Sequence, residues 1–554
     1  MLIENSRMNN QIKSRSSDRL PNRLFLIWMT VWTLANSLTL TRFPYVHSDE
    51  LWLAGLSQAI LKAKSLLVTE PFFDVYPRQV HAMKLLYHAI QACFIKVLGY
   101  QVLSVRLISL LSGALVLMML FHYGKKVFED SRVALFLSVL AGLHIQFIYA
   151  SHLARQEMLL MAALVMAAIW MTGVQKAPHW LAPLVIGLSA LIHPNALVVA
   201  TMIGLVLLKN VLTRRMPWRR LFQFIGILSV CAAVLVGLSL FFTPEFLDNY
   251  ARFGATLAVD ADPISRWQNL ISFFVKLGGQ ISGTYWLPDL RFWFALTVVV
   301  VPASVLALLT SGEYLNQRNR TGLVDGLCLF AGYLIATFVI GRNNPTSILF
   351  ALFPLVILVG HLIQSVGQAK SRLLRTLSFL AACGVLTAGL FGSIQSVRPF
   401  LNSKTDPYET YLEEIRSNLP RDAVVLGNLS AGFALEDVAF FDIRNLDAIA
   451  TGLERPVTKA DLIAYIRERR INTVIWYEEY EYILRNPQWR ILYEDQPDGL
   501  AVSEPLTLLN QILTESGNLI HEFESPVYGT RIIRFMGDYP WKVSLISLDP
   551  KTIS

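Results

Sequence analysis

The chain has 554 residues, of which 54% are hydrophobic and only 16% are charged, whereas an ordinary soluble protein carries about 25% charged residues. So large an apolar excess does not fit one water-soluble core, and it excludes the fibrous, disordered and disulfide-stapled classes. The net charge of +8 is unevenly spread, because residues 1–394 carry 32 Lys and Arg against 16 Asp and Glu, and residues 395–554 carry 16 against 24. A basic membrane part precedes an acidic soluble part, and basic residues beside membrane helices do not indicate a nucleic-acid partner.

The first predicted element is a membrane anchor. Residues 1–23 are polar and basic, and they run into an apolar stretch without a small-residue cleavage pattern, which predicts a cytoplasmic tail and an uncleaved helix. A membrane-spanning helix needs about 20 apolar residues. Eleven stretches meet or nearly meet this length, which predicts a polytopic α-helical membrane domain over residues 24–394. They cover residues 24–41, 102–123, 133–150, 157–173, 180–192, 195–208, 221–242, 291–310, 322–340, 346–365 and 373–394.

The charges of the connections predict the orientation. With the N-terminal tail in the cytoplasm, the connections richest in Lys and Arg, 124–132 and 209–220, are cytoplasmic too. The loop 42–101 and residues 395–554 then lie outside. Within that loop, residues 81–98 place apolar and polar residues on separate helical faces, which predicts a helix lying on the outer surface rather than a twelfth span.

The pattern of residues 395–554 predicts a soluble α/β domain. Short apolar runs at 423–426, 438–443, 473–477 and 531–535 predict strands, and helical patterns at 458–470 and 504–516 lie between them.

The outer loop opens with a pair of acids, Asp49 and Glu50, followed by a helix-like run over residues 51–63. Adjacent carboxylates just beyond a membrane exit can serve as a general base with its partner, or as a cation site. They can equally mark a helix start, with Ser48 as the cap and the two acids complementing the helix dipole. Spacing alone leaves both interpretations open.

Two further clusters lie at predicted outer span ends. Arg155 and Glu157 stand immediately before the fourth span, and charges there either pair with each other, extend to the interface or face a wet cavity. Arg342 lies in a connection between two outer span ends. Its guanidinium can bind the oxygens of a lipid phosphate, or it can anchor the helix end at the membrane interface. His193, in a proline-containing turn, is either structural or in contact with substrate. The outer face also holds His47, His81, His88 and His152, so a divalent metal stays open, although no fixed ligand spacing such as HExxH occurs.

Together these residues resemble a known pattern. The first span exits into Asp49-Glu50, an amphipathic juxtamembrane helix follows, Arg106-Leu107 leads a second span that ends in Gly124-Lys125-Lys126, and Arg155-x-Glu157 precedes the fourth span. This layout is similar to the GT-C superfamily of membrane glycosyltransferases, in the branch of protein O-mannosyltransferases and the lipid A aminoarabinose transferase. The resemblance implies a bacterial cytoplasmic membrane, a polyprenyl-phosphate sugar as donor, inversion at the anomeric carbon, and an extracytoplasmic glycan, lipid or protein as acceptor.

The resemblance also implies roles for individual residues. Asp49 would take the proton of the acceptor hydroxyl, with Glu50 beside it, and basic residues at the outer rim would stabilise the departing lipid phosphate. The expected substrate-binding residues are Arg155, Glu157, Arg342, Lys84, Arg78, His81 and His193. The sequence departs from the family where Gln156 replaces a frequent proline and where His81 and Lys84 replace a commoner Lys-Pro pair. The sugar, a hexose or a pentose, and the acceptor are therefore left open.

The main alternative is a membrane transporter or a flippase for lipid-linked sugars. Transporters commonly show discontinuous helices in two matching halves with charges near the midplane, whereas this chain shows no matching halves and gathers its acids at one face. A non-catalytic scaffold would leave the outer carboxylates and arginines without a role. The sequence therefore favours an enzyme.

Overall fold

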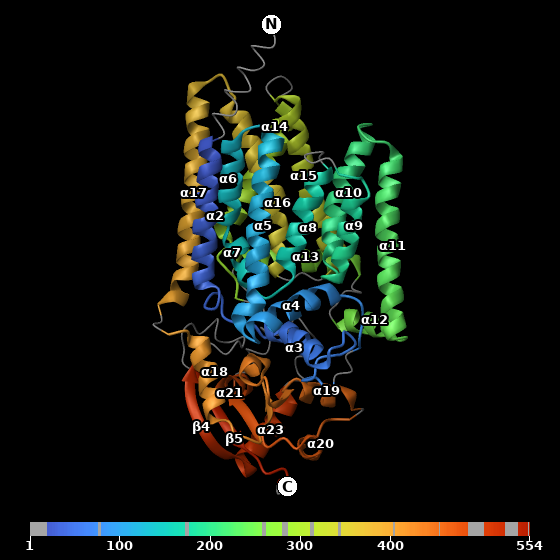
Figure 1. Ribbon diagram of the computed structural model, residues 1–554, viewed down its shortest axis with the longest axis vertical. Helices are drawn as coiled ribbons and strands as arrows, with labels where there is room; N and C mark the ends of the chain where they lie inside the picture. The colour runs from blue at the N-terminus through green and yellow to red at the C-terminus, as the bar shows by residue number, and fades with distance from the viewer. Residues whose placement is uncertain are drawn as a thin grey trace.

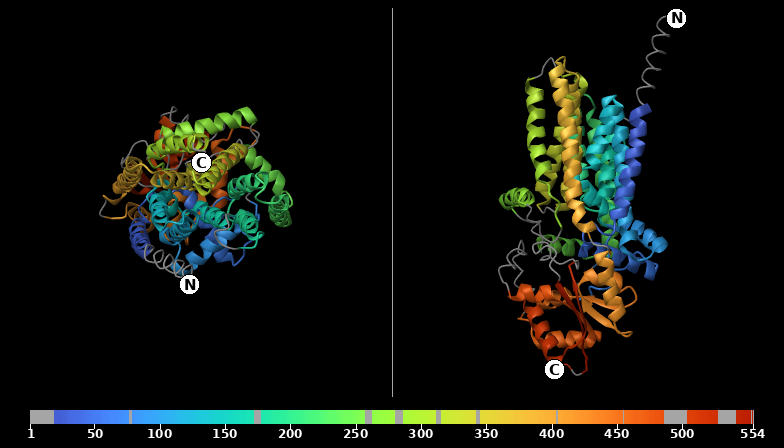
Figure 2. Two further views of the ribbon diagram at one scale, coloured as in Figure 1. Left: turned by 90° about the horizontal axis from the view of Figure 1, so that it is seen from above. Right: turned by 90° about the vertical axis from the view of Figure 1, so that its left-hand side faces the viewer.

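The protein consists of a long helical bundle with an α/β domain at one end, as the computed structural model shows in Figure 1 and, from the side, in Figure 2. The structure describes residues 19–75, 79–171, 177–256, 262–279, 286–310, 315–341, 345–402, 405–453, 455–485, 503–526, 541–551 and 553.

Helices occupy all eleven apolar stretches predicted from the sequence. Among the described residues, six helices are long and apolar enough to cross a membrane, or seven if the pair α6 and α7, bent by 62°, is one span. The chain is thus a multi-pass membrane protein, and the number of eleven spans stays a prediction. The bundle helices are α2 (Arg19–Thr39), α5 (Val102–Phe128), α6 (Ser131–Gly142), α7 (Ile145–His152), α8 (Glu157–Met171), α9 (Leu181–Leu188), α10 (Ala196–Leu212), α11 (Trp218–Phe242), α14 (Arg291–Thr310), α15 (Gln317–Ile340), α16 (Leu349–Gly367) and α17 (Arg372–Leu401).

The bundle is built around α16, most of which is buried, whereas α11 and α17 turn large apolar side chains outward. Small residues allow close packing, since a Cβ added to Gly332 of α15 would lie 2.7 Å from the Met202 Cα of α10. Two helices that the sequence analysis did not predict, α12 (Phe246–Thr256) and α13 (Pro263–Gly278), lie between α11 and α14 in the chain. The helix α17 continues past the predicted domain boundary at residue 394 to Leu401.

The loop between α2 and α5 forms a layer of its own. It contains α3 (Ser48–Ala63) and α4 (Leu85–Leu98), which lie across the end of the bundle, between it and the α/β domain (Figure 1). The 14-residue α4 is shorter than a membrane span, and Leu86 and Val97 on it are exposed. The stretch predicted as a surface helix is thus a short helix at the end of the bundle.

The α/β domain has a five-stranded sheet in the order β2-β1-β3-β5-β4. The strands β1 (Val424–Gly427), β2 (Ala439–Asp442) and β3 (Thr473–Tyr477) are parallel and match predicted strands, whereas β5 (Trp541–Ser547) pairs antiparallel with β3 and with β4 (Asn518–Ser525). The predicted strand at 531–535 lies outside the described residues. The helices of this domain are α18 (Pro407–Asn418), α19 (Asn445–Gly452), α20 (Lys459–Arg469), α21 (Glu478–Arg485) and α23 (Ser503–Ser516), with a 3-10 turn η3 (Leu429–Ala434).

The α/β domain and the α3 layer share one hydrophobic core. Leu51 and Phe72 of the layer belong to the same buried cluster as Leu429 of the domain. At Gly432 the approach is so close that an added Cβ would lie 2.9 Å from Leu51 Cδ2. The Asn445 side-chain amide donates to the Phe72 carbonyl at 2.9 Å.

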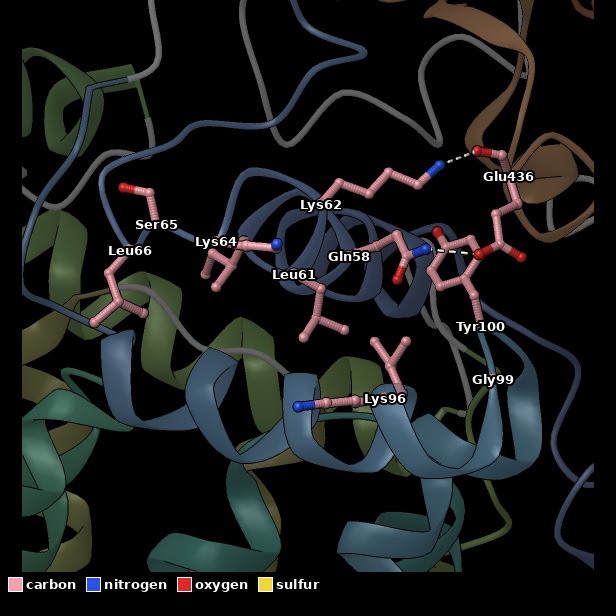
Figure 3. A pocket seen from close by; sticks show the side chains of 12 residues that line it. Gln58, Leu61, Lys62, Lys64, Ser65, Leu66, Lys96, Gly99, Tyr100 and Glu436 are labelled. Carbon is pink, nitrogen blue, oxygen red and sulfur yellow. Dashed lines mark hydrogen bonds between the residues drawn. The ribbon is translucent and has the colours of Figure 1, made fainter.

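A groove of about 660 Å³ opens beside this contact, at the far end of α3 (Figure 3). Gln58 and Lys62 reach from α3 to Glu436 of the domain, with the Gln58 amide 2.6 Å from Glu436 Oε1, and Lys96 lies across the groove on α4. The domain therefore contacts α3 at this end as well as near Leu51.

Candidate active site

The first turn of α3 carries the predicted acidic pair, but its cap is His47 rather than Ser48. His47 Nδ1 accepts a hydrogen bond from the Asp49 backbone N–H at 3.0 Å, and Glu50 Oε1 accepts one from the His47 N–H at 3.0 Å. This reciprocal arrangement is a capping box, in which a neutral imidazole nitrogen replaces the usual hydroxyl. The acids therefore mark a helix start, whereas a catalytic role stays a prediction.

Glu50 forms a buried ion pair with Arg106 of α5. Their carboxylate and guanidinium meet through two bonds of 2.8 Å each, and the side chains are 1% and 0% exposed. Arg106 also donates to three backbone carbonyls of the loop, at Leu40, Phe43 and Pro44. Such a fork fastens the loop to the bundle and keeps Glu50 away from solvent. Glu50 is therefore buried in the first turn of α3, next to Asp49 in the chain.

Asp49 is linked to the predicted outer cluster by Arg155. Arg155 Nη1 donates to Asp49 Oδ2 at 2.6 Å, while its Nε donates to Glu157 Oε1 at 3.1 Å. The Thr346 hydroxyl donates to the same Glu157 oxygen at 2.7 Å. The structure thus brings together three predicted residues from two separate segments. The ion pair of Arg155 and Glu157 is present, and it extends to a second carboxylate, that of Asp49.

The Asp49 carboxylate is ionised and partly accessible. Its burial alone would raise its pKa, but the cap His47 and the charges of Arg155, Arg444 and Lys84 outweigh that effect and hold the pKa below its ordinary value. Its side chain is 34% exposed. An ionised carboxylate with access to solvent can accept a proton at neutral pH.

Lys84 and His193 lie near the same centre. The Lys84 charge acts on Asp49 and on His193, and burial together with the charges of Lys84 and Arg155 holds the pKa of His193 well below its usual range. His193 is therefore neutral, and its Nδ1 accepts from the Asn195 N–H at 3.0 Å. His81 lies further along the layer, with its ring 5.9 Å from that of Phe246 on α12.

Arg444 belongs to this site, although the sequence analysis did not identify it. It precedes α19 in the α/β domain and places its guanidinium 5.1 Å from the ring centre of Trp52 and 4.9 Å from that of Phe73. Trp52 lies three residues after Asp49 on α3. The charges of Arg444 and Asp49 act on each other, and no local pattern in the sequence connects the two residues.

Arg78 and Arg342, both predicted to contact a phosphate, lie outside the described residues. Arg342 directly precedes the segment that supplies Thr346 to the Glu157 contact. Within the described part of the chain, no group of three or more His, Cys, Asp or Glu side chains is placed to hold a metal ion. His88, one of the predicted outer histidines, is instead 2.9 Å from the Ser57 hydroxyl in the core of the α3 layer.

No protein-family model matches the chain, and no curated protein matches it in sequence. Its structure is similar to that of ArnT from Cupriavidus metallidurans bound to undecaprenyl phosphate, with a TM-score of 0.60 and 14% identity over 94% of this chain and 97% of that one. The apo state of the same protein gives a TM-score of 0.59 at 14% identity, over 95% and 98% of the two chains.

The archaeal oligosaccharyltransferase AglB from Archaeoglobus fulgidus, in complex with an inhibitory peptide and a dolichol-phosphate, is also similar. Its TM-score is 0.51 at 11% identity, over 90% of this chain and 73% of that one. The two proteins share with this chain the arrangement of the bundle and most of its length. The chain therefore has the fold of the GT-C superfamily of membrane glycosyltransferases, as the resemblance of its motifs predicted.

Proposed function

We propose that the chain is an inverting glycosyltransferase that moves a sugar from a polyprenyl-phosphate donor to a hydroxyl of an extracytoplasmic glycan, lipid or protein. Asp49 is the general base and Glu50 is the residue that positions it. The observation that carries the proposal is the Asp49 carboxylate, ionised, partly exposed and held by Arg155 on a loop that the buried pair of Glu50 and Arg106 fastens to the bundle.

The reaction is a single displacement. Asp49 accepts the proton of the acceptor hydroxyl while that oxygen bonds to the anomeric carbon of the donor. The bond from this carbon to the phosphate oxygen breaks, and its electron pair stays on the departing lipid phosphate. Attack and departure occur on opposite faces of the sugar, so the anomeric configuration inverts. The ionised state of Asp49 makes it ready for this step at neutral pH.

Basic residues near Asp49 can stabilise the departing lipid phosphate. Lys84 and Arg155 both act on Asp49, and Arg78 and Arg342 remain candidates from the sequence. Cationic groups near a phosphate whose charge grows in the transition state lower the barrier. A lipid-phosphate donor is further supported by the bound lipids of the similar structures, undecaprenyl phosphate in ArnT and dolichol-phosphate in AglB.

The distribution of charge supports an outward-facing site. Loop 42–101 and the α/β domain lie at one end of the bundle, while the stretches 124–132 and 209–220, which carry clusters of Lys and Arg, lie at the other (Figure 1). Since cytoplasmic connections carry the excess of Lys and Arg, the site and the domain face the extracytoplasmic side. For a bacterial cytoplasmic membrane this is the periplasm, or the cell exterior.

The test is transfer of a radiolabelled sugar from synthetic polyprenyl-phosphate donors by the purified full-length protein in detergent. We expect Asp49→Asn to abolish transfer to an acceptor, and also slow transfer to water, while the protein stays folded. Asp437→Asn is the matched control, because Asp437 is an exposed carboxylate of the α/β domain. A chelator arm tests dependence on a divalent metal, and the anomer of the product tests inversion.

Full activity of Asp49→Asn would refute the role of Asp49. Retention of the anomeric configuration would refute the single displacement. If wild type and variant bind the lipid equally and consume no donor with any sugar, the transferase assignment fails. In that case the assay to perform is movement of the lipid-linked sugar across vesicles, which tests the transporter or flippase alternative.

A further inference from the structure

The α/β domain also contacts a short segment of the loop near Asp49, residues 70–75. The Asp442 backbone N–H donates to the Phe72 carbonyl at 3.0 Å, and the Asn445 amide donates to the same carbonyl. Glu70, at the start of the segment, accepts from the Trp52 indole of α3 at 2.6 Å. The segment thus connects the end of β2 to the first turns of α3.

Arg444 lies at the centre of this contact in a defined orientation. Its Nε donates to Asp442 Oδ1 at 2.7 Å and its Nη2 to Oδ2 at 3.2 Å, so the guanidinium plane is fixed by a fork. Trp52 and Phe73 hold the guanidinium through their rings, an arrangement that favours a cation. Despite these contacts its side chain is 36% exposed. Arg444 is therefore held rigidly without being sealed from solvent.

The charge of Arg444 lowers the pKa of Asp49, the proposed base. The cationic surroundings of Asp49 come from three different elements: Arg155 before α8, Lys84 before α4, and Arg444 from the α/β domain. The first two belong to the membrane part of the chain. The third is present only while the domain contacts the layer of α3.

We propose that Arg444 is a positioning residue of the Asp49 site, supplied by the α/β domain, so that the site is complete only while this domain is docked on α3. This inference rests on the proposed function of Asp49 as the base. It gives the domain a part in the chemistry in addition to any contact with the acceptor. Undocking removes a cation from the base and from the surface that faces the substrates.

The direct test is the titration of Asp49. Infrared difference spectra between a protein and the same protein carrying Asp49→Asn isolate the carboxyl band of Asp49, and they need no substrate. In Arg444→Gln the loss of a neighbouring cation should move the midpoint of this band upward by up to about one pH unit. Arg444→Lys keeps the charge, and it should restore most of the original midpoint.

Arg469→Gln is the matched control for docking. Arg469 bonds to Asp74 in the same segment and stacks on Tyr465, so it also joins the domain to the loop. A purely structural role of Arg444 predicts that both variants behave alike. Our inference predicts that only Arg444→Gln moves the Asp49 midpoint, and that kcat/KM falls more at pH 4 than at pH 8.

An unchanged Asp49 midpoint in Arg444→Gln overturns the inference, and so do equal shifts in the two variants. Failure of the proposed function would give a different experimental result. If the midpoint moves in Arg444→Gln but the wild type transfers no sugar from any donor, the contact between the domain and Asp49 stands, and the transferase assignment fails.

Discussion

Replacing Arg106 with Met removes the ion-pair partner of Glu50, whose carboxylate is buried. In the wild type the guanidinium makes two bonds to Glu50 and three to backbone carbonyls, and both side chains are fully buried. After the replacement the carboxylate keeps only the N–H groups of His47 and Ala154 as partners among the bonds described here. Removing one partner of a buried pair costs about 3–5 kcal/mol, a large part of a total stability of about 5–15 kcal/mol.

The assay measures the temperature at which half of the detergent-solubilised protein remains monodisperse after heating. We expect a marked decrease for Arg106→Met and a partial recovery when Glu50→Leu is added, because the second change removes the unpaired charge while the carbonyls still lack a donor. Arg291→Met is the control, since Arg291 pairs with Asp289 at the surface and its loss should leave this temperature nearly unchanged. A double variant no more stable than Arg106→Met would refute the reasoning.

Three further predictions concern the site and the docked domain. Arg155→Gln removes a cation from Asp49 and raises its pKa, so the acidic limb of the pH–rate profile should move to higher pH, whereas an unmoved limb contradicts the contact. Gly432→Val places a side chain against Leu51, so the α/β domain should be cleaved faster by a protease than in wild type, with unchanged cleavage as the contrary result. Burial and the charge of Asp442 raise the pKa of Asp447 to about 7, so its folded form binds protons more tightly than its unfolded form, and wild-type stability falls between about pH 4 and 7. Thermal unfolding of Asp447→Asn should therefore show a gain over wild type at pH 8 that vanishes below pH 4.

The sequence predicted the bundle well because the membrane makes the pattern simple. A helix that crosses lipid needs a long apolar run, and such runs are visible without any knowledge of contacts. The acidic pair could be located for a similar reason, since it directly follows the first run. The cap was wrong because His47 was not considered as an acceptor, although a neutral imidazole nitrogen accepts as a serine hydroxyl does.

The α/β domain was predicted only in part. Its parallel strands are continuous apolar runs, but β4 is an edge strand that carries His521, Glu522 and Glu524, so its pattern resembles a polar segment. In β5 the alternation of buried Trp541, Val543 and Leu545 was a readable signal that was missed. Arg444 had no such signal, because its importance arises from a contact between distant parts of the chain.

The shared core of the loop and the α/β domain also determines when the protein can finish folding. Phe72 and its partner Asn445 are 373 residues apart in the chain. At a synthesis rate of about 5–20 residues per second, the loop waits about 20–75 s for the surface that buries it. During that time α2 and the following helices are already available for insertion into the membrane. The layer that carries Asp49 is therefore among the first parts to be made and among the last to be completed, which delays assembly of the site until the polypeptide is nearly whole.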